Sequence, residues 1–137
     1  MSENRLPMSL RGTVCHGDKR GRVLGFPTAN LNGETPCEMA YGVYASTTRI
    51  ADRSYPSVTS YGTRPTFDGF DTRIETHILD FNEDIYGREI EVDLVAFIRP
   101  ELRFTSMDEL IDAIHGDMKA VRAFHAPAGQ QGEGVQQ

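Results

Sequence analysis

Apolar and polar side chains alternate along several short segments of this chain. Successive side chains of a β-strand point to opposite faces, so this alternation is typical of a strand with one buried face. Turn-forming pairs lie between the segments, namely Asn32-Gly33, Asp68-Gly69 and Tyr86-Gly87. The alternation predicts strands at residues 10–15, 43–49, 55–61, 74–81 and 89–98.

The last of these segments is the most regular. Its expected core face carries Ile90, Val92, Leu94, Ala96 and Ile98. No segment with a helical period interrupts the strands before Pro100, so we expect them to form an antiparallel sheet rather than a parallel one. Five or six antiparallel strands in a small domain close most economically into a barrel.

A helix is predicted after these strands. Ser106 followed by Glu109 is a capping-box pair, and Asp108 adds a second acid to the first turn, where the helix dipole favours negative charge. Apolar residues then recur at helical spacing, at Met107, Leu110, Ile111, Ile114, Met118 and Val121. We expect this stripe to pack against the barrel, with Gly116 as a weak point in the helix.

The chain is expected to form a single domain over residues 9–125, preceded by a flexible N-terminus over residues 1–8. Residues 126–137 are rich in Gly and Gln and have little to bury, so we expect a disordered tail. The two cysteines, Cys15 and Cys37, are too few for a disulfide scaffold, and their spacing is not that of a zinc site.

Charge and hydropathy narrow the possible partners. The net charge of -6 argues against nucleic-acid binding and against binding to an anionic membrane, because phosphate surfaces attract a broad basic face. The first residues lack the apolar stretch of a secretory signal, and no apolar run is long enough to span a bilayer. We therefore expect a cytoplasmic protein that acts as a monomer on small molecules.

A glycine-rich basic segment is the first candidate for chemistry. Gly17, Gly21 and Gly25 allow the backbone to turn N–H groups toward an anion, and Arg22 lies among them. These features are typical of a flap over a nucleotide phosphate. The same residues could equally shape a surface turn with solvated cations.

Oxygen donors follow this segment directly. Pro27 restricts its own backbone, and Thr28 and Asn30 then present a hydroxyl and an amide oxygen, which are ligands that Mg²⁺ prefers. Because neither side chain is charged, phosphate oxygens would complete such a metal site.

Glu75 is a candidate general base. It begins the predicted strand 74–81, and partial burial near a barrel mouth would raise the pKa of its carboxyl toward the value that a base needs. A surface glutamate at a strand end is the alternative. Tyr86 lies in a turn that could flank a planar ring or could be a hairpin with core aromatic side chains. Residues 62–67 and 99–104 are two loops that each combine a cation with an aromatic side chain.

In this order, these motifs resemble the riboflavin kinase family. The resemblance covers residues 10–124 and is carried by short motifs, which are Gly12-Thr13-Val14, Arg20-Gly21-Arg22, Gly25-Phe26-Pro27-Thr28-Ala29-Asn30, Tyr61-Gly62-Thr63-Arg64-Pro65, Glu75-Thr76-His77, Asp84-Ile85-Tyr86-Gly87 and Arg99-Pro100-Glu101 with Phe104. It implies a six-stranded antiparallel Greek-key β-barrel with one long C-terminal α-helix.

The resemblance also implies roles for individual residues. Glu75 would be the catalytic base, and Thr28 and Asn30 would hold Mg²⁺ or another divalent ion. The residues implied for binding the nucleotide are Gly17, Arg22, Gly25, Pro27, Thr28, Asn30 and Tyr86. Those implied for binding the flavin are Arg64, Pro65, Arg99, Glu101 and Phe104.

The implied reaction transfers the γ-phosphate of ATP to the ribityl 5'-hydroxyl of riboflavin and gives FMN and ADP. Many bacterial members carry an N-terminal nucleotidyltransferase domain, and this chain lacks the length and the histidine-glycine signature of that domain, so FAD synthesis is not expected. A barrel that binds flavin or nucleotide as a non-catalytic sensor is the alternative. The presence of Thr28, Asn30 and Glu75 favours the enzyme.

Overall fold

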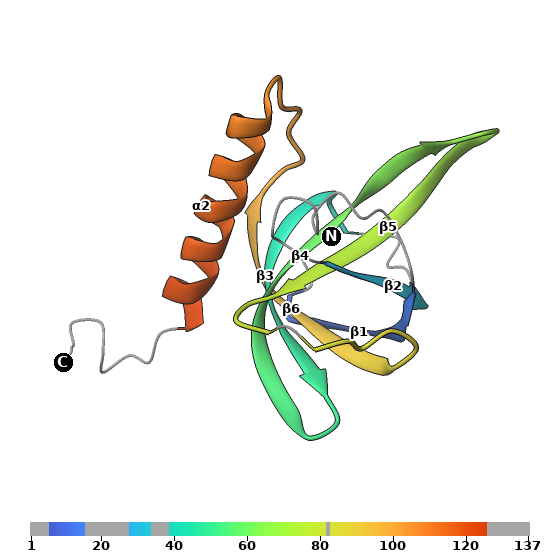
Figure 1. Ribbon diagram of the computed structural model, residues 1–137, viewed down its shortest axis with the longest axis vertical. Coiled ribbons are helices and arrows are strands. Elements are labelled where there is room, and N and C mark those ends of the chain that lie inside the picture. Colours follow the sequence, from blue (N-terminus) through green and yellow to red (C-terminus); the bar gives the residue numbers. More distant parts are fainter. Residues whose placement is uncertain (1–5, 16–27, 34–38, 82, 126–137) are drawn as a thin grey trace.

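The alternating segments of the sequence form the wall of a closed antiparallel barrel (Figure 1). The structure is a computed structural model that describes residues 6–15, 28–33, 39–81 and 83–125, and only the backbone of residues 64–66, 70 and 71. The described residues form six strands and one helix. Their bounds are β1 Met8–Cys15, β2 Ala29–Gly33, β3 Gly42–Ile50, β4 Arg53–Thr66, β5 Gly69–Ile78, β6 Glu89–Arg99 and α2 Met107–His125.

The strands follow one another around the barrel in the order β1-β2-β5-β4-β3-β6. Every neighbouring pair is antiparallel. Because the ring is closed, β5 and β6 lie three strands apart in both directions and therefore form opposite walls. The predicted fold class, a mainly β barrel with a C-terminal helix, is confirmed.

Strand β2 is the one that the alternation did not predict. Its residues include Asn32 and Gly33, which the sequence interpretation treats as a turn. In the structure Asn32 pairs with Thr13 and Gly33 with Gly12, so these residues end a strand. The weak strand preference of this segment is outweighed by its position between β1 and β5.

The hairpin of β4 and β5 is longer than predicted. Its register continues to the pair Thr66 and Gly69, so the segment 62–67 belongs mostly to a strand and not to a loop. The hairpin extends beyond the rest of the barrel (Figure 1). The predicted turn at Asp68 and Gly69 is confirmed at its tip.

The inside of the barrel combines apolar and hydroxyl side chains. Its buried apolar side chains include Leu10, Tyr44, Ile74, Val92 and Leu94. Its buried hydroxyls come from Ser46, Thr48, Ser57, Thr59 and Thr76. These hydroxyls form hydrogen bonds with one another, for example Thr59 Oγ1 with Thr76 Oγ1 at 3.1 Å. They are therefore buried with hydrogen-bond partners.

Strand β6 changes face part-way along its length. The pairing of β3 with β6 shifts register between Ala45 and Ser46 and again between Val43 and Tyr44. Ile90, Val92 and Leu94 consequently lie inside the barrel, whereas Ala96 and Ile98 pack in the outer cluster beneath the helix. The prediction that all five residues share one face is wrong for these last two, because a bulge adds a residue that reverses the alternation.

Helix α2 packs on the outer face of β3 and β4, beside the barrel in Figure 1. Val121 is fully buried there against Val43, Ala45 and Val58. The predicted cap at Ser106 is present, because its Oγ accepts the Glu109 N–H at 3.1 Å. Within the described ranges, no helix combines the length and the apolar character needed to cross a membrane.

Candidate active site

The pairing of β2 with β5 brings two of the predicted site residues together. Asn30 lies directly opposite Glu75 in this antiparallel ladder. Asn30 also pairs with Cys15 of β1, and Glu75 pairs with Ser60 of β4. Since directly paired residues of an antiparallel sheet present their side chains to the same face, Cys15, Asn30, Glu75 and Ser60 form a row across four strands.

This row lies on the outer face of the barrel wall. The alternate residues of β5, Ile74, Thr76 and Ile78, are buried inside. Glu75 therefore points outward and is half-buried, whereas Asn30 is only 4% exposed. The sequence predicts Glu75 near the barrel mouth, and the register adds that its side chain lies on the outer face.

Arg73 joins the same face and was missed by the sequence interpretation. Its Nη1 donates a hydrogen bond to Asn30 Oδ1 at 3.1 Å. The guanidinium thus contacts the amide oxygen that the sequence predicts as a metal ligand. The sequence does contain a signal for this placement, because Arg73 precedes Glu75 by two residues, and side chains two residues apart on a strand point to the same face.

The remaining residues predicted for nucleotide binding differ in how far the structure places them. Thr28 is half-buried and precedes β2 directly. Tyr86 is exposed in a turn that is bonded to the end of β1, since Gly87 N–H donates to the Val14 carbonyl at 2.9 Å. Gly17, Arg22, Gly25 and Pro27 lie outside the described residues.

Arg99, a predicted flavin residue, makes its contacts with the helix. Its Nε and Nη2 donate to the two carboxylate oxygens of Asp117 at 2.8 and 2.7 Å. The guanidinium also lies 5.8 Å from the centre of the Phe104 ring. Asp117 is 6% exposed, so this two-point pair is largely shielded from water and joins the end of β6, from which the segment 100–105 continues, to α2.

That segment crosses two glycines at one end of the barrel. A Cβ at Gly42 would lie 2.5 Å from the Arg99 carbonyl oxygen, and a Cβ at Gly62 would collide with the Glu101 carboxylate. Gly62 pairs with Arg73 across β4 and β5. Glu101 therefore lies on the outer face beside the strand that carries Arg73 and Glu75.

The other two predicted flavin residues, Arg64 and Pro65, belong to the outer part of β4, where their backbones pair with Asp71 and Phe70. Their side chains lie outside the described residues. Tyr61, which precedes Gly62 on β4, points into the barrel and is 4% exposed. Its ring packs edge-on against Tyr41 with the ring centres 5.0 Å apart, so it contributes to the core.

The donor atoms near Asn30 fit a hard divalent cation. A threonine hydroxyl and an amide oxygen are neutral oxygen ligands of the kind that Mg²⁺ binds together with phosphate oxygens. Asn30 Oδ1 has two lone pairs, and the bond from Arg73 uses one of them.

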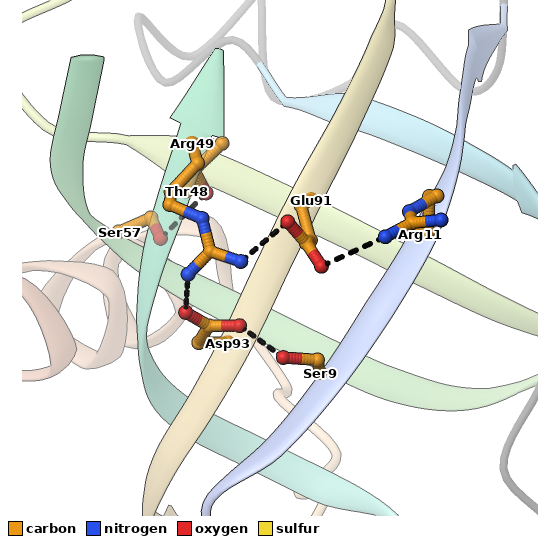
Figure 2. A network of polar contacts seen from close by, with 7 residues as sticks. All are labelled: Ser9, Arg11, Thr48, Arg49, Ser57, Glu91 and Asp93. Carbon is orange, nitrogen blue, oxygen red and sulfur yellow. Dashed lines mark hydrogen bonds and ion pairs between the residues drawn. The ribbon is translucent and has the colours of Figure 1, made fainter. Parts of the chain in front are cut away.

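The opposite wall carries charged residues of a different kind (Figure 2). On the outer face of β6, Glu91 and Asp93 both bond to Arg49 of β3. Arg11 of β1 also lies 3.4 Å from Glu91, and the Ser9 hydroxyl donates to Asp93. Hydrogen bonding to Arg49 lowers the pKa of the Glu91 carboxyl. We call these five residues the β6 charge network.

Comparison with known families decides the classification of this barrel. The family model described as "Flavokinase: Riboflavin kinase" matches residues 4–125. The chain belongs to the riboflavin kinase family. Among curated proteins of that kind, the bifunctional riboflavin kinase/FMN adenylyltransferase of Listeria monocytogenes is 43% identical over 122 residues. The alignment covers 88% of this chain but only 39% of the Listeria protein, so the chain spans about two fifths of that relative.

Solved structures share the fold. A Streptococcus pneumoniae protein described as a macrolide-efflux protein superposes with a TM-score of 0.78 and 41% identity, over 85% of this chain and 38% of the other. The riboflavin kinase of Trypanosoma brucei superposes with a TM-score of 0.61 and 26% identity, over 86% of this chain and 76% of the other. The family assignment therefore has support from both sequence and fold.

Proposed function

We propose that this chain transfers the γ-phosphate of ATP to the ribityl 5'-hydroxyl of riboflavin, forming FMN and ADP. One observation carries the proposal: Glu75 stands between Asn30 on one side and the Glu101 segment over Gly62 on the other. Asn30 belongs to the predicted phosphate and metal site, and Glu101 to the predicted flavin site. A base between the two is where a sugar hydroxyl would meet a triphosphate.

Thr28 and Asn30 would hold Mg²⁺ in this proposal, together with phosphate oxygens of ATP. The two residues lie two positions apart, and an extended backbone through Thr28 would put both oxygens on one face. When bound, the divalent ion neutralises negative charge that builds up on the transferring phosphate.

Glu75 would accept or orient the proton of the ribityl hydroxyl. That oxygen would form a bond to the γ-phosphorus while the bond from phosphorus to the ADP oxygen breaks, so that the proton passes toward Glu75 and ADP leaves. Because the phosphoryl transition state is loose, positioning of the two substrates supplies much of the acceleration. The half-buried position of Glu75 limits competition from water.

The flavin ring would bind near the end of the barrel that the segment 100–105 covers. Arg64 and Pro65 on β4, with Arg99, Glu101 and Phe104, are the residues that we assign to this site. Arg99 would act through its bond to Asp117, which holds the segment in place. The nucleotide would contact Gly17, Arg22, Gly25, Pro27 and Tyr86 in addition to the metal ligands. We further propose that the chain acts in the cytoplasm, where ATP is available, as a monomer.

The direct test is to incubate the purified chain with riboflavin, ATP and Mg²⁺ and to separate the flavins by chromatography. We expect FMN to form, and we expect chelation of divalent ions to stop its formation. The sensor alternative predicts binding of riboflavin and nucleotide, measured by flavin fluorescence and calorimetry, without product. That outcome would refute the proposed activity.

A further inference from the structure

We propose that Arg73 binds the transferring γ-phosphate of the nucleotide, beyond its contact with Asn30. This inference rests on the proposed kinase function. It concerns a residue that none of the motifs considered above includes, and it begins from the position of the guanidinium on the outer face of β5.

Arg73 lies where the two proposed substrate sites meet. Its Nη1 bonds to Asn30 Oδ1 at 3.1 Å on the nucleotide side. On the other side it is the cross-strand partner of Gly62, over which the Glu101 carboxylate lies. Glu75, two residues further along β5, shares its face. A phosphate that approaches Glu75 from Asn30 would therefore pass beside this guanidinium.

The partner of Arg73 differs from those of other arginines. Within the described ranges, Arg11, Arg49, Arg99 and Arg122 each contact a carboxylate. Arg73 instead donates a hydrogen bond to a neutral amide. A carboxylate partner satisfies a guanidinium by charge as well as by hydrogen bonds, whereas an amide forms a hydrogen bond without adding a negative charge.

The hydrogen-bonding capacity of Arg73 also permits a second partner. A guanidinium has five N–H donors, and the bond to Asn30 uses one of them. Another donor can reach a phosphate oxygen while the first still fixes the orientation of the Asn30 amide. Asn30 Oδ1 already accepts a bond from the cationic guanidinium of Arg73. A metal ion on the same oxygen would therefore lie near a second positive charge, and an anionic phosphate between Arg73 and the metal ion would offset their repulsion.

The test compares binding of nucleotides that differ only in the third phosphate. Calorimetry would measure the affinity of the chain for Mg²⁺ with ADP and for Mg²⁺ with a non-hydrolysable ATP analogue. We expect Arg73→Gln to weaken binding of the triphosphate analogue by about tenfold and binding of ADP by less than about twofold, because one charge-assisted contact is lost. We also expect kcat to fall while the KM for riboflavin changes little.

Arg49→Gln is the matched control, since it makes the same substitution on the outer face of β3, where Arg49 pairs with Glu91 of the opposite wall. It should leave both nucleotide affinities unchanged. Thermal unfolding of each variant would show whether it folds, and Arg73→Lys, which keeps the charge, would replace Arg73→Gln if that variant unfolds. The lysine variant should retain part of the preference for the triphosphate.

Equal losses for ADP and the triphosphate analogue in the Arg73 variant, or no loss at all, would overturn the inference. Failure of the proposed function has a different signature, because the unmodified chain would then form no FMN, whether or not it binds nucleotides. The two failures can therefore be distinguished in the same set of measurements.

Discussion

The two opposite walls of the barrel, β5 and β6, both direct charged and polar side chains outward. The side chains of the two walls differ in the groups that they contact. On β6, Glu91 and Asp93 are bonded to Arg49, and Arg11 and Ser9 complete the network (Figure 2). On β5, Arg73 bonds to the amide of Asn30, which lies opposite Glu75. Alternation along a strand places polar residues outside in both cases, and the neighbouring strands decide what these residues contact.

This difference bears directly on ligand binding. Ion pairs on the β6 wall neutralise charge within the protein, so an incoming phosphate or metal would have to break them before binding. The β5 wall combines a cation, a neutral oxygen donor and a carboxylate within a few residues of one another. It is also bordered by the segment 100–105, which crosses Gly42 and Gly62. The proposed chemistry therefore belongs to β5.

Substitution of Glu75 should produce the largest effect. We expect Glu75→Gln to lower kcat by about 10²- to 10⁴-fold, the usual contribution of a general base, with the affinity for riboflavin almost unchanged. Steady-state kinetics and fluorescence titration of riboflavin would measure the two quantities. Glu91→Gln, the same change on the β6 wall, is the control and should keep full activity. If kcat of the Glu75 variant is normal, the base lies elsewhere.

Loss of the Asp117 carboxylate should have the next largest effect. Asp117→Asn leaves the Arg99 guanidinium largely buried without a charged partner, which we expect to lower the free energy of unfolding by about 3 kcal/mol. It should also raise the KM for riboflavin by about tenfold and leave the KM for ATP unchanged, because the end of β6, beside the proposed flavin site, loses its bond to α2.

Asp80→Asn provides the comparison for Asp117→Asn. Asp80 pairs with Arg122 of the same helix at 3.0 Å, but both groups are exposed and far from the segment 100–105 in sequence. The variant should have an unchanged KM for riboflavin. A similar rise in KM in both variants would mean that any loosening of the helix, and not the Arg99 contact, weakens flavin binding.

A smaller effect is expected at Gly62. A methyl group at this position collides with the Glu101 carboxylate, which can move because it is the end of a flexible side chain. We expect Gly62→Ala to raise the KM for riboflavin several-fold and to change the KM for ATP little. Gly116→Ala, in open space on α2, makes the same chemical change and should only stabilise the helix, by about 1 kcal/mol. A normal KM for riboflavin in Gly62→Ala would remove Glu101 from the flavin site.

The β6 charge network should contribute least, and its contribution should depend on pH. Because Arg49 lowers the folded pKa of Glu91, this carboxylate stabilises the fold above its unfolded pKa and loses that effect as the pH falls through its folded pKa. Glu91→Gln should therefore lower Tm slightly at neutral pH, and the difference from the unmodified chain should shrink as the pH falls through the folded pKa of Glu91. A difference in Tm that grows as the pH falls would contradict this sign.

Much of the fold could be predicted from the sequence, and particular residues show where prediction stops. The alternation identified five of the six described strands. It could not identify β2, because Asn32 and Gly33 have turn chemistry and are extended only through pairing with β1. It also placed Ala96 and Ile98 on the wrong face, because a bulge is a property of the pairing between β3 and β6.

The candidate site shows the same division. Short motifs singled out Thr28, Asn30 and Glu75, and the strand register then brought Asn30 opposite Glu75. The bond of Arg99 to Asp117 joins residues from β6 and α2, and the sequence interpretation assigned Asp117 no role. Alternation along the strand could have placed Arg73 on the face of Glu75, but only the structure shows its contact with Asn30. Contacts between elements that are distant in sequence depend on the packing of the whole barrel.

The most direct test of a metal site on the β5 wall is paramagnetic broadening in NMR spectra. Mn²⁺ with ADP would be added to the ¹⁵N-labelled chain, and the loss of each backbone amide signal would be measured. We predict that the amide signals of Asn30 and Glu75 weaken most and that those of Glu91 and Asp93 weaken least. Strongest broadening on the β6 wall, or equal broadening on both walls, would contradict the account.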